Sequence, residues 1–381
     1  MNDQVEKSFR FDLREANGAL GDIGTLLPLT IGMIALVGLS AHQVLLGFGV
    51  FYIVSGLVYR LPIPVQPMKA IAAVALVAEV TPGSLMLSGV LIGVALLLLG
   101  GSGAIDRIAR LVPQSVLSGL QLGLGLALAW IALGLMQGQM LIGAISLLVA
   151  IVALRFGTHA ALATVATGVG LGLLMGPSDM PLALDGQSMG WTLPGVGVAD
   201  VIPAMTELAL PQLAMTLTNA VFLTALVAQD SFGSRARHVT PRKLCLTSGA
   251  ANLVLAPLGA VPMCHGAGGV AAHHRFGART GGAPVMLGGA LVVLALVPEQ
   301  VRQMALASVP AATLGALLLI AAFELAANRR LFDARPSCRP VIAAAAVATV
   351  FFNPMLGLVA GTLAEILRKA VLARWHPQRR S

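Results

Sequence analysis

Apolar runs long enough to cross a lipid bilayer follow one another along most of this chain. A membrane-spanning helix needs about 20 apolar residues. Of the 381 residues 57% are hydrophobic and only 10% are charged, whereas a water-soluble domain carries about 25% charged residues. The chain therefore lacks the polar side chains to cover a water-facing surface. This composition indicates an all-α integral membrane protein and excludes a soluble enzyme or a nucleic-acid-binding protein, despite the net charge of +8.

Charged residues, prolines and glycines divide the sequence into fourteen apolar segments, seven on each side of a polar stretch. We predict a first repeat over residues 1–175, an extracytoplasmic linker over 176–209, a second repeat over 210–372 and a cytoplasmic tail over 373–381. The third and tenth segments are too short to cross a bilayer alone. The predicted segments are 19–38, 41–59, 67–80, 84–101, 112–135, 139–154, 159–175, 210–228, 244–258, 266–276, 282–297, 304–325, 340–352 and 354–372.

The distribution of Lys and Arg predicts the orientation of these segments. When the N-terminus is placed in the cytoplasm and the segments alternate, all but two of the 24 basic residues fall on the cytoplasmic side, as the positive-inside rule requires. Arg302 falls outside, and Lys69 falls within a segment. Because seven is an odd number, the second half must be inverted relative to the first. We therefore predict a 7+7 inverted repeat in the cell (inner) membrane, with both termini cytoplasmic.

Two interruptions are expected to form half-helices. Residues 61–70 contain three prolines, which cannot continue a helix, so a short extended strand should lead into a half-helix that starts near Pro67. The second interruption, 259–269, should lead into a half-helix that starts near His265. Free N–H groups and partial positive charge make helix N-termini suitable for anions. The glycines that follow His265, including Gly266 and Gly268, allow a ligand to approach the backbone closely.

Charged residues inside the predicted segments suggest a function. A lysine within a membrane helix is costly unless it is paired or functional, and Lys69 lies about one turn into the third segment. Asp22 in the first segment could bind a coupling ion or proton, or could pair with Lys69. The predicted substrate-binding residues are Gln66, Pro67, Met68, Lys69, Thr25, Asn219, His265, Gly266 and Gly268, with Asp22 as the coupling-ion candidate.

Polar residues of the eighth segment are spaced as one helical stripe. Gln212, Thr216, Asn219 and Asp230 stand at i, i+4, i+7 and i+18. Such a stripe would face the protein interior, either to line a site or to form hydrogen bonds between helices. We expect Asn219 to line the site and Asp230 to lie at the cytoplasmic end.

No arrangement of residues predicts a metal or a cofactor. The three cysteines are widely spaced and form no ligand cluster. The adjacent His273 and His274 lie near the predicted cytoplasmic face, where we expect them to cap a helix. We therefore expect no bound cofactor.

Two stretches resemble a known family. The sequences GALGDIGTLLP at 18–28 and PVQPMKAIAA at 64–73 are similar to signatures of the molybdate transporter family (MOT1-type), which is related to the SulP sulfate permeases. The stretch from Leu210 to Asn219 resembles the family's matching segment. The resemblance implies a core domain of segments 1–4 and 8–11, a gate domain of segments 5–7 and 12–14, and a substrate between half-helices 3 and 10. It also leads us to expect a homodimer, and the short tail predicts no STAS domain.

The residues predict a secondary active transporter of an anion, and the resemblance implies a tetrahedral oxyanion, with molybdate as the first candidate. Uptake of a dianion against an inside-negative potential costs about 2.3 kcal/mol per charge per 100 mV, so cotransported cations are required, and protons through Asp22 are expected. The alternatives are a sulfate permease, a nucleobase permease and a passive anion channel. A nucleobase permease fits Lys69 and the aromatic content of 4% less well. An intramembrane enzyme has no supporting motif.

Overall fold

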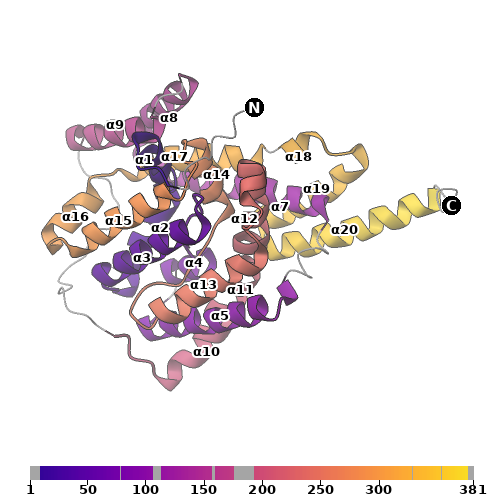
Figure 1. Cartoon of the computed structure of the whole chain (residues 1–381), viewed down its shortest axis with the longest axis horizontal. Coiled ribbons are helices and arrows are strands. Elements are labelled where there is room, and N and C mark those ends of the chain that lie inside the picture. The colour runs from indigo at the N-terminus through magenta and orange to yellow at the C-terminus, as the bar shows by residue number, and fades with distance from the viewer. Residues whose placement is uncertain are drawn as a thin grey trace.

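The computed structural model describes residues 9–77, 79–105, 113–156, 159–175, 193–327, 329–352 and 354–375. Its regular structure is almost entirely helical (Figure 1). Within the described ranges, two short strands are found, β1 (Gln66–Pro67) and β2 (Met263–Cys264).

The helices of the first half are α1 (Leu13–Leu20), α2 (Ile23–Val37), α3 (Ala41–Tyr59), α4 (Lys69–Val77), α5 (Pro82–Gly101), α7 (Gln114–Gln137), α8 (Met140–Arg155) and α9 (Ala160–Met175). Those of the second half are η1 (Val198–Asp200), α10 (Val201–Pro203), η2 (Ala204–Ala209), α11 (Leu210–Met215), η3 (Thr216–Leu223), α12 (Thr224–Phe232), η4 (Gly233–Ala236), α13 (Pro241–Leu255), α14 (Ala267–Arg275), α15 (Gly282–Leu296), α16 (Glu299–Ala307), α17 (Ala311–Ala326), α18 (Arg329–Phe332), η5 (Pro336–Cys338), α19 (Arg339–Phe351) and α20 (Pro354–Trp375).

Local sequence signals determine where several helices begin. Ser40, Thr81 and Thr240 precede α3, α5 and α13, and each side chain accepts a hydrogen bond from a first-turn amide. Such caps satisfy amides that have no partner within the helix. Pro82 and Pro241 occupy the first helical position, where the missing N–H has no cost.

The elements from η1 to η4 run as one helix of 39 residues, Val198–Ala236. Its η2 and η3 sections are π-helical, so the helix does not keep the period of 3.6 residues on which the predicted stripe depends. Gln212, Thr216 and Asn219 are buried, whereas Asp230 is exposed at the far end. The four residues therefore do not share one buried face.

Glycines bring two pairs of helices into close contact. Helix α3 packs along α15, and α5 packs along α13. A Cβ added at Gly49 would lie 2.8 Å from the carbonyl oxygen of Gly288, and one added at Gly288 would lie 2.6 Å from that of Gly49. Gly93 and Gly249 are related in the same reciprocal way at 3.0 Å. Small residues allow helix backbones to approach each other in this manner, as is common in membranes.

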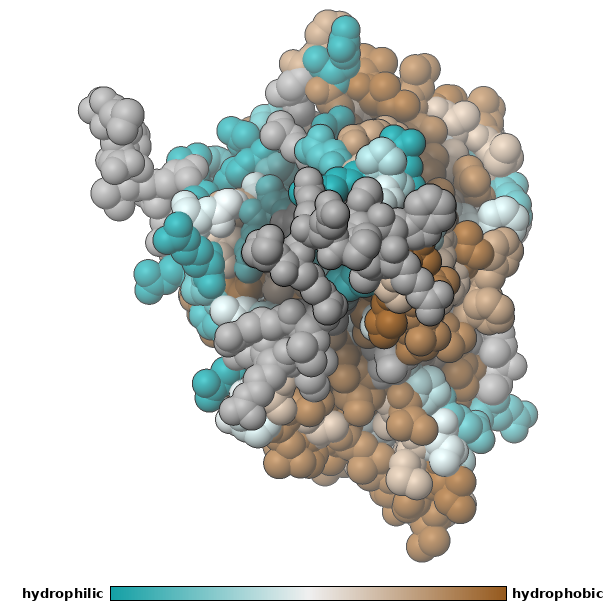
Figure 2. All heavy atoms as spheres, turned by 90° about the vertical axis from the view of Figure 1, so that its right-hand side faces the viewer, coloured by the Kyte–Doolittle hydropathy of each residue, from teal (hydrophilic) through white to brown (hydrophobic). Residues whose placement is uncertain are grey.

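The outer surface is strongly apolar. Figure 2 shows hydrophobic side chains over much of the face that carries the C-terminal helices, and on α20 the side chains of Leu363, Ile366 and Leu367 are 60–66% exposed. Within the described residues, four helices are long and apolar enough to cross a membrane, or five if the pair Glu299–Ala307 and Ala311–Ile320, bent by 58°, forms one span. Such a surface suits contact with lipid.

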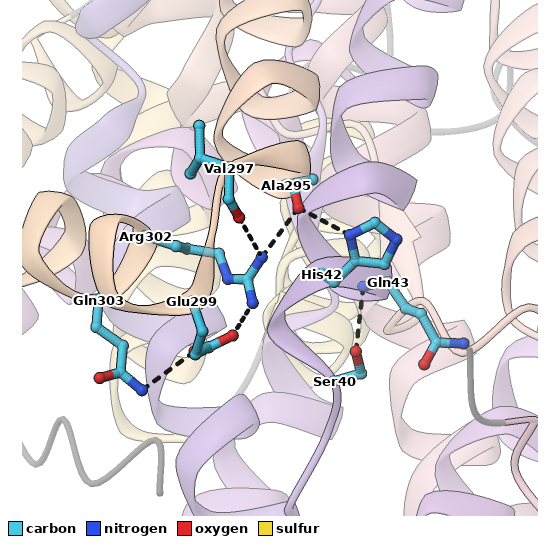
Figure 3. Close-up of polar contacts among 8 residues, drawn as sticks. All are labelled: Ser40, His42, Gln43, Ala295, Val297, Glu299, Arg302 and Gln303. Carbon is cyan, nitrogen blue, oxygen red and sulfur yellow. Dashed lines mark hydrogen bonds and ion pairs between the residues drawn. The ribbon is translucent and has the colours of Figure 1, made fainter. Parts of the chain in front are cut away.

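A buried arginine joins α15 to α16 (Figure 3). Arg302 is 1% exposed and forms an ion pair with Glu299. Its Nη1 donates to the carbonyl oxygens of Ala295 at 2.9 Å and of Val297 at 3.4 Å, and His42 Nδ1 lies 2.7 Å from the same Ala295 oxygen. The last carbonyl groups of a helix have no partner within it, so these contacts complete the end of α15. Arg302, the one basic residue predicted on the outside, is thus paired and buried.

Asp200 connects the first turn of the long helix to the start of α5. Its carboxylate accepts hydrogen bonds from Thr81 Oγ1 at 2.5 Å, the Gly197 amide at 2.7 Å and Ser84 Oγ at 2.9 Å. These bonds favour the ionised form and lower the pKa of Asp200. The connection is therefore present near neutral pH and is lost only as the pH falls through that lowered value.

Candidate functional site

The two predicted interruptions meet as a small antiparallel ladder. Gln66 pairs with Cys264 and Pro67 with Met263, and the Met68 amide donates to the Pro262 carbonyl at 3.0 Å. Because the strands are antiparallel, α4 and α14 leave the ladder from its opposite ends.

Both helices begin two residues later than predicted. Helix α4 begins at Lys69 rather than Pro67, and α14 begins at Ala267 rather than His265. The residues in between have their backbone groups engaged in or beside the ladder, which delays the first helical turn.

A side chain of α13 extends the ladder. Asn252 Nδ2 donates to the Met263 carbonyl at 2.6 Å, and its Oδ1 accepts from the Met263 amide at 2.8 Å. This carboxamide therefore makes the paired bonds that a third strand would make. Sequence reasoning missed Asn252, since nothing in its local sequence indicates this role.

Four side chains from different elements form a buried polar chain. Tyr52 Oη donates to Asp22 Oδ2 at 2.6 Å, Gln66 Nε2 donates to Asp22 Oδ1 at 2.5 Å, and Lys69 Nζ donates to Gln66 Oε1 at 3.1 Å. Asp22 and Gln66 are at most 1% exposed. Among the described residues, Asp22 and Lys69 form no direct ion pair. The Gln66 carboxamide links them, because it forms a hydrogen bond with each. The sequence analysis did not predict the bond from Tyr52 to Asp22.

The start of α14 lies against this chain. A Cβ at Gly269 would come within 2.7 Å of Asp22 Oδ1 and 2.6 Å of Gln66 Nε2, and one at Gly266 would overlap Gln66 Oε1. Gly268, between them, is also buried. The absence of side chains at these positions is therefore what allows α14 to approach the carboxylate and the carboxamide.

His273 lies deeper than expected. It is fully buried, and its Nδ1 lies 2.8 Å from the Gly18 carbonyl oxygen. Its Nε2 has no hydrogen-bond partner among the described residues, and the ring is close enough to Asp22 for an electrostatic interaction. His273 therefore contacts a carbonyl in the last turn of α1, which is the contact expected of a helix-capping residue, but it does so from a fully buried position.

His265 joins the two interruptions. Its Nδ1 lies 2.8 Å from the Pro64 carbonyl oxygen, and its Nε2 lies 2.9 Å from Thr247 Oγ1, which is itself 2.7 Å from Tyr59 Oη. Both ring nitrogens are thus engaged within the protein. This arrangement suits a residue that positions the ladder, and leaves no ring nitrogen for an anion.

Gln212 caps α4. Its Oε1 accepts from the amides of Ala70 at 2.8 Å and Ile71 at 3.4 Å, and its Nε2 donates to Thr216 Oγ1 at 2.9 Å. Two first-turn amides of α4 are therefore already satisfied. The polar stripe of the eighth segment was the sequence signal for Gln212, although it did not indicate this contact.

The two helix N-termini consequently differ. Among the described residues, the amides of Gly268 and Gly269 at the start of α14 donate no hydrogen bond, whereas α4 carries the Gln212 cap. The N-terminus of α14 is therefore the one with amides available.

Two predicted site residues do not join the polar chain. Asn219 lies in η3, and its Oδ1 is buried with no hydrogen-bond partner. Thr25 lies in α2 and is 7% exposed. In the described part of the protein, no hydrogen bond connects either side chain to Asp22, Gln66 or Lys69.

No group of three or more His, Cys, Asp or Glu side chains among the described residues is placed to hold a metal ion. The chemistry that the arrangement offers is a buried carboxylate, a partly buried cation, two carboxamides and free backbone amides. Such groups can bind an anion and exchange a proton.

Comparison with known proteins identifies relatives over nearly the whole chain. The family described as "Molybdate transporter of MFS superfamily" matches residues 14–128 and 204–325. Molybdate transporter 1 of Arabidopsis thaliana is 28% identical over 408 aligned residues, which cover 94% of this chain and 89% of that protein. Molybdate transporter 1 of Chlamydomonas reinhardtii is 29% identical, with 95% of this chain and 93% of that protein covered.

Solved structures share the fold at low sequence identity. The transmembrane domain of the cyanobacterial bicarbonate transporter BicA superposes with a TM-score of 0.57 at 14% identity, covering 93% of this chain and 98% of that one. Murine Slc26a9, an anion transporter solved in an inward-facing state, gives a TM-score of 0.64 at 13% identity, covering 95% of this chain and 69% of that one.

These likenesses confirm the mostly helical fold of SulP-type transmembrane domains and a multi-pass membrane protein. They also identify a transporter rather than an enzyme. Because the family match extends over more than half of its residues, this chain belongs to the molybdate transporter family.

Proposed function

We propose that this protein is a secondary active transporter of a tetrahedral oxyanion, with molybdate as the substrate, that works by alternating access in the cell (inner) membrane. The names of its relatives support molybdate. The single observation that carries the proposal is the partly buried Lys69 at the start of α4, the cationic end of a polar chain that borders the uncapped start of α14. An unpaired cation is costly inside a membrane protein, and an anionic substrate would compensate for it.

In this proposal, Lys69 and the amides of Gly268 and Gly269 hold the anion. The charge of Lys69 and the positive end of α14 act together. Asn219 supplies a neutral contact through its carboxamide. Gln66 and Gln212 set the positions of these groups, while Thr25, Met68, Pro67 and Gly266 border the space.

We further propose the fourteen-segment inverted repeat, with α4 and α14 as half-helices. The packing supports it, since α3 against α15 is matched by α13 against α5, and α2 against α4 is matched by α12 against α14. Likewise α8 against α9 is matched by α19 against α20. When the predicted segments 1–7 are exchanged with segments 8–14, in order, each helix pair of a match becomes the other pair. Such internal symmetry is the usual basis of alternating access.

The division into core and gate domains follows the same scheme. Helices α7 and α17, the fifth and twelfth segments in this numbering, pack on each other and would form the centre of the gate. Movement of the core against this gate would expose the site to one side at a time. Both termini would face the cytoplasm, and the gate would form the contact of a homodimer.

We propose protons as the coupling ions and Asp22 as their site. Inward movement of a dianion against the membrane potential costs about 2.3 kcal/mol per charge per 100 mV, so each turnover needs cations. Asp22 is the buried carboxylate of the polar chain, and the Gln66 carboxamide connects it to Lys69 by two hydrogen bonds.

Uptake into proteoliposomes tests the function. Labelled molybdate and labelled sulfate are each offered with and without an inward proton gradient, and each is competed by the other. We expect molybdate uptake that is accelerated by the gradient and resists an excess of sulfate. Preference for sulfate would identify a sulfate permease, and insensitivity to the gradient would identify a passive channel. Transport of uracil without either anion would contradict the anion site.

A further inference from the structure

We propose that the Gln66 carboxamide couples protonation of Asp22 to the release of Lys69 for the anion. This inference rests on the proposed function and assigns the coupling step to one side chain. Its basis is the position of Gln66, which bonds to the carboxylate through one end of its carboxamide and to the ammonium through the other.

The chemistry of the neighbours fixes the orientation of the carboxamide. An ionised carboxylate only accepts hydrogen bonds, an ammonium only donates, and a carboxamide has one accepting and one donating end. With Asp22 ionised and Lys69 charged, Nε2 must face Asp22 and Oε1 must face Lys69, as observed at 2.5 Å and 3.1 Å. Lys69 is then held by Gln66.

Protonation of Asp22 changes which end of the Gln66 carboxamide must face it. Tyr52 donates to Oδ2 at 2.6 Å, so Oδ2 keeps its donor and the proton is carried by Oδ1. The new O–H then donates to Gln66, which must present Oε1 to Asp22. Rotation of the carboxamide by half a turn turns Nε2 toward Lys69, donor against donor. The Lys69–Gln66 bond is lost, and the ammonium becomes available to the anion.

Close packing limits Gln66 to these two orientations. A Cβ at Gly266 would overlap Oε1, and one at Gly269 would lie 2.6 Å from Nε2. The carboxamide therefore has no room to swing away from its neighbours, although rotation in place needs little more volume. Two discrete arrangements of one side chain are what a coupling element requires.

The ionisable groups around the polar chain come from three elements. Tyr52 of α3 and His273 of α14 face Asp22, whereas Cys264 of β2 lies close enough to Lys69 for an electrostatic interaction. His273 is the only imidazole among them and needs a separate control, because an imidazole titrates near neutral pH.

The consequence is reciprocal linkage between proton and anion. A proton on Asp22 strengthens anion binding at Lys69, and a bound anion favours the proton by the same factor. On the outside, the two bind together. On the less acidic inside, loss of the proton returns Gln66 to Lys69 and weakens the hold on the anion.

The test measures molybdate affinity by titration calorimetry on the purified, nanodisc-embedded protein, between about pH 8 and about pH 5, where carboxylates of raised pKa and imidazoles titrate. Buffers of different ionisation enthalpy report the protons taken up on binding. For the wild type we expect the affinity to rise about tenfold on acidification, within the usual size of such couplings, with uptake of protons. In Gln66→Met, which keeps the length but has no hydrogen-bonding end, binding should become independent of pH and release or take up no proton.

Two further variants keep the proposal falsifiable even if Gln66→Met does not fold. Asp22→Asn mimics the protonated acid toward Gln66 and should bind molybdate at pH 8 as tightly as the wild type does at pH 5. His273→Asn should keep the wild-type dependence on pH.

Several results would overturn the proposal. An unchanged pH dependence of binding in Gln66→Met would mean that Asp22 acts on the anion by charge alone. Weak molybdate binding by Asp22→Asn at high pH would contradict the proposal, and so would loss of the pH dependence in His273→Asn. A wild type that binds molybdate equally at every pH would also contradict it. A wild type that binds neither molybdate nor sulfate at any pH would contradict the proposed function instead, so the two failures are distinguishable.

Discussion

Single residues at the site act through charge and through the space that they leave open. Lys69 supplies the cation, and Gln66 holds it at 3.1 Å. We expect Lys69→Gln to weaken molybdate binding at least tenfold, because a neutral carboxamide cannot offset the charge of a dianion in a low-dielectric site. Lys69→Arg, which keeps the charge, should lose less. Equilibrium binding of labelled molybdate measures both, and equal affinity in Lys69→Gln and the wild type would exclude Lys69 from the site.

Gly269 tests the space beside the polar chain. In Gly269→Ala the new methyl group would meet Gln66 Nε2 at 2.6 Å, Asp22 Oδ1 at 2.7 Å and Pro64 Cβ at 2.7 Å. We expect a loss of stability of about 1–3 kcal/mol, the usual cost of overpacking. Gly289→Ala is the matched control, since it lies within a helix and its new Cβ would meet nothing within 4 Å. Thermal unfolding in detergent should show a lower Tm for the first variant and an unchanged or higher Tm for the second.

At the scale of the elements, Gln212 connects the long π-containing helix to α4, because its side chain accepts hydrogen bonds from two first-turn amides of α4. Gln212→Glu preserves the accepting oxygen and adds a negative charge at the positive end of α4. We expect its Tm to match or exceed that of the wild type, while its affinity for molybdate falls at least tenfold through repulsion. Gln212→Leu, which removes the cap, should lose about 1 kcal/mol of stability. A Gln212→Glu variant with unchanged affinity would show that α4 does not face the anion.

The junction of α15 and α16 provides a second element-scale prediction. Arg302→Met removes the ion pair of Glu299 and the guanidinium donor of the Ala295 and Val297 carbonyls, of which Ala295 keeps its contact with His42. We expect a loss of about 2–3 kcal/mol, since buried polar groups without partners are costly. Arg302→Lys keeps the charge but not the forked geometry, and should lie between the two. Unfolding temperatures measure the order of the three proteins, and equal values would contradict the role of Arg302 as an anchor.

The interruptions were predictable as elements, but their contacts were not. Three prolines in residues 61–70 and the glycines after His265 exclude a continuous helix on local grounds. The pairing of Gln66 with Cys264 joins positions far apart in the chain, and no local preference encodes it. For the same reason the sequence left open whether Asp22 pairs with Lys69. Whether the two residues pair depends on Gln66, which lies between them and bonds to both. The π-helical turns of η3, which move Asp230 off the buried face, produce no periodic pattern that the sequence could reveal.

At the scale of the whole molecule, orientation and number of crossings depend on the basic residues. The prediction places the start of the long helix Val198–Ala236 outside and its end inside. Val198 is 92% exposed and Ser234 is also exposed, so cysteines at these positions should be accessible. Cys245 and Cys264 are buried, and Cys338→Ser removes the remaining partly exposed thiol.

A membrane-impermeant thiol reagent applied to intact cells then measures the topology. We expect Val198→Cys to react in intact cells and Ser234→Cys to react only after the membrane is permeabilised, because one crossing separates them. Ala199→Cys, at an exposed neighbour of Val198, is the matched control for local reactivity. The opposite pattern would invert the whole protein, and the reaction of both sites in intact cells would remove a crossing from the second half. Only the second result would break the 7+7 inverted arrangement, since a wholly inverted protein keeps the odd number of crossings that the arrangement requires in each half.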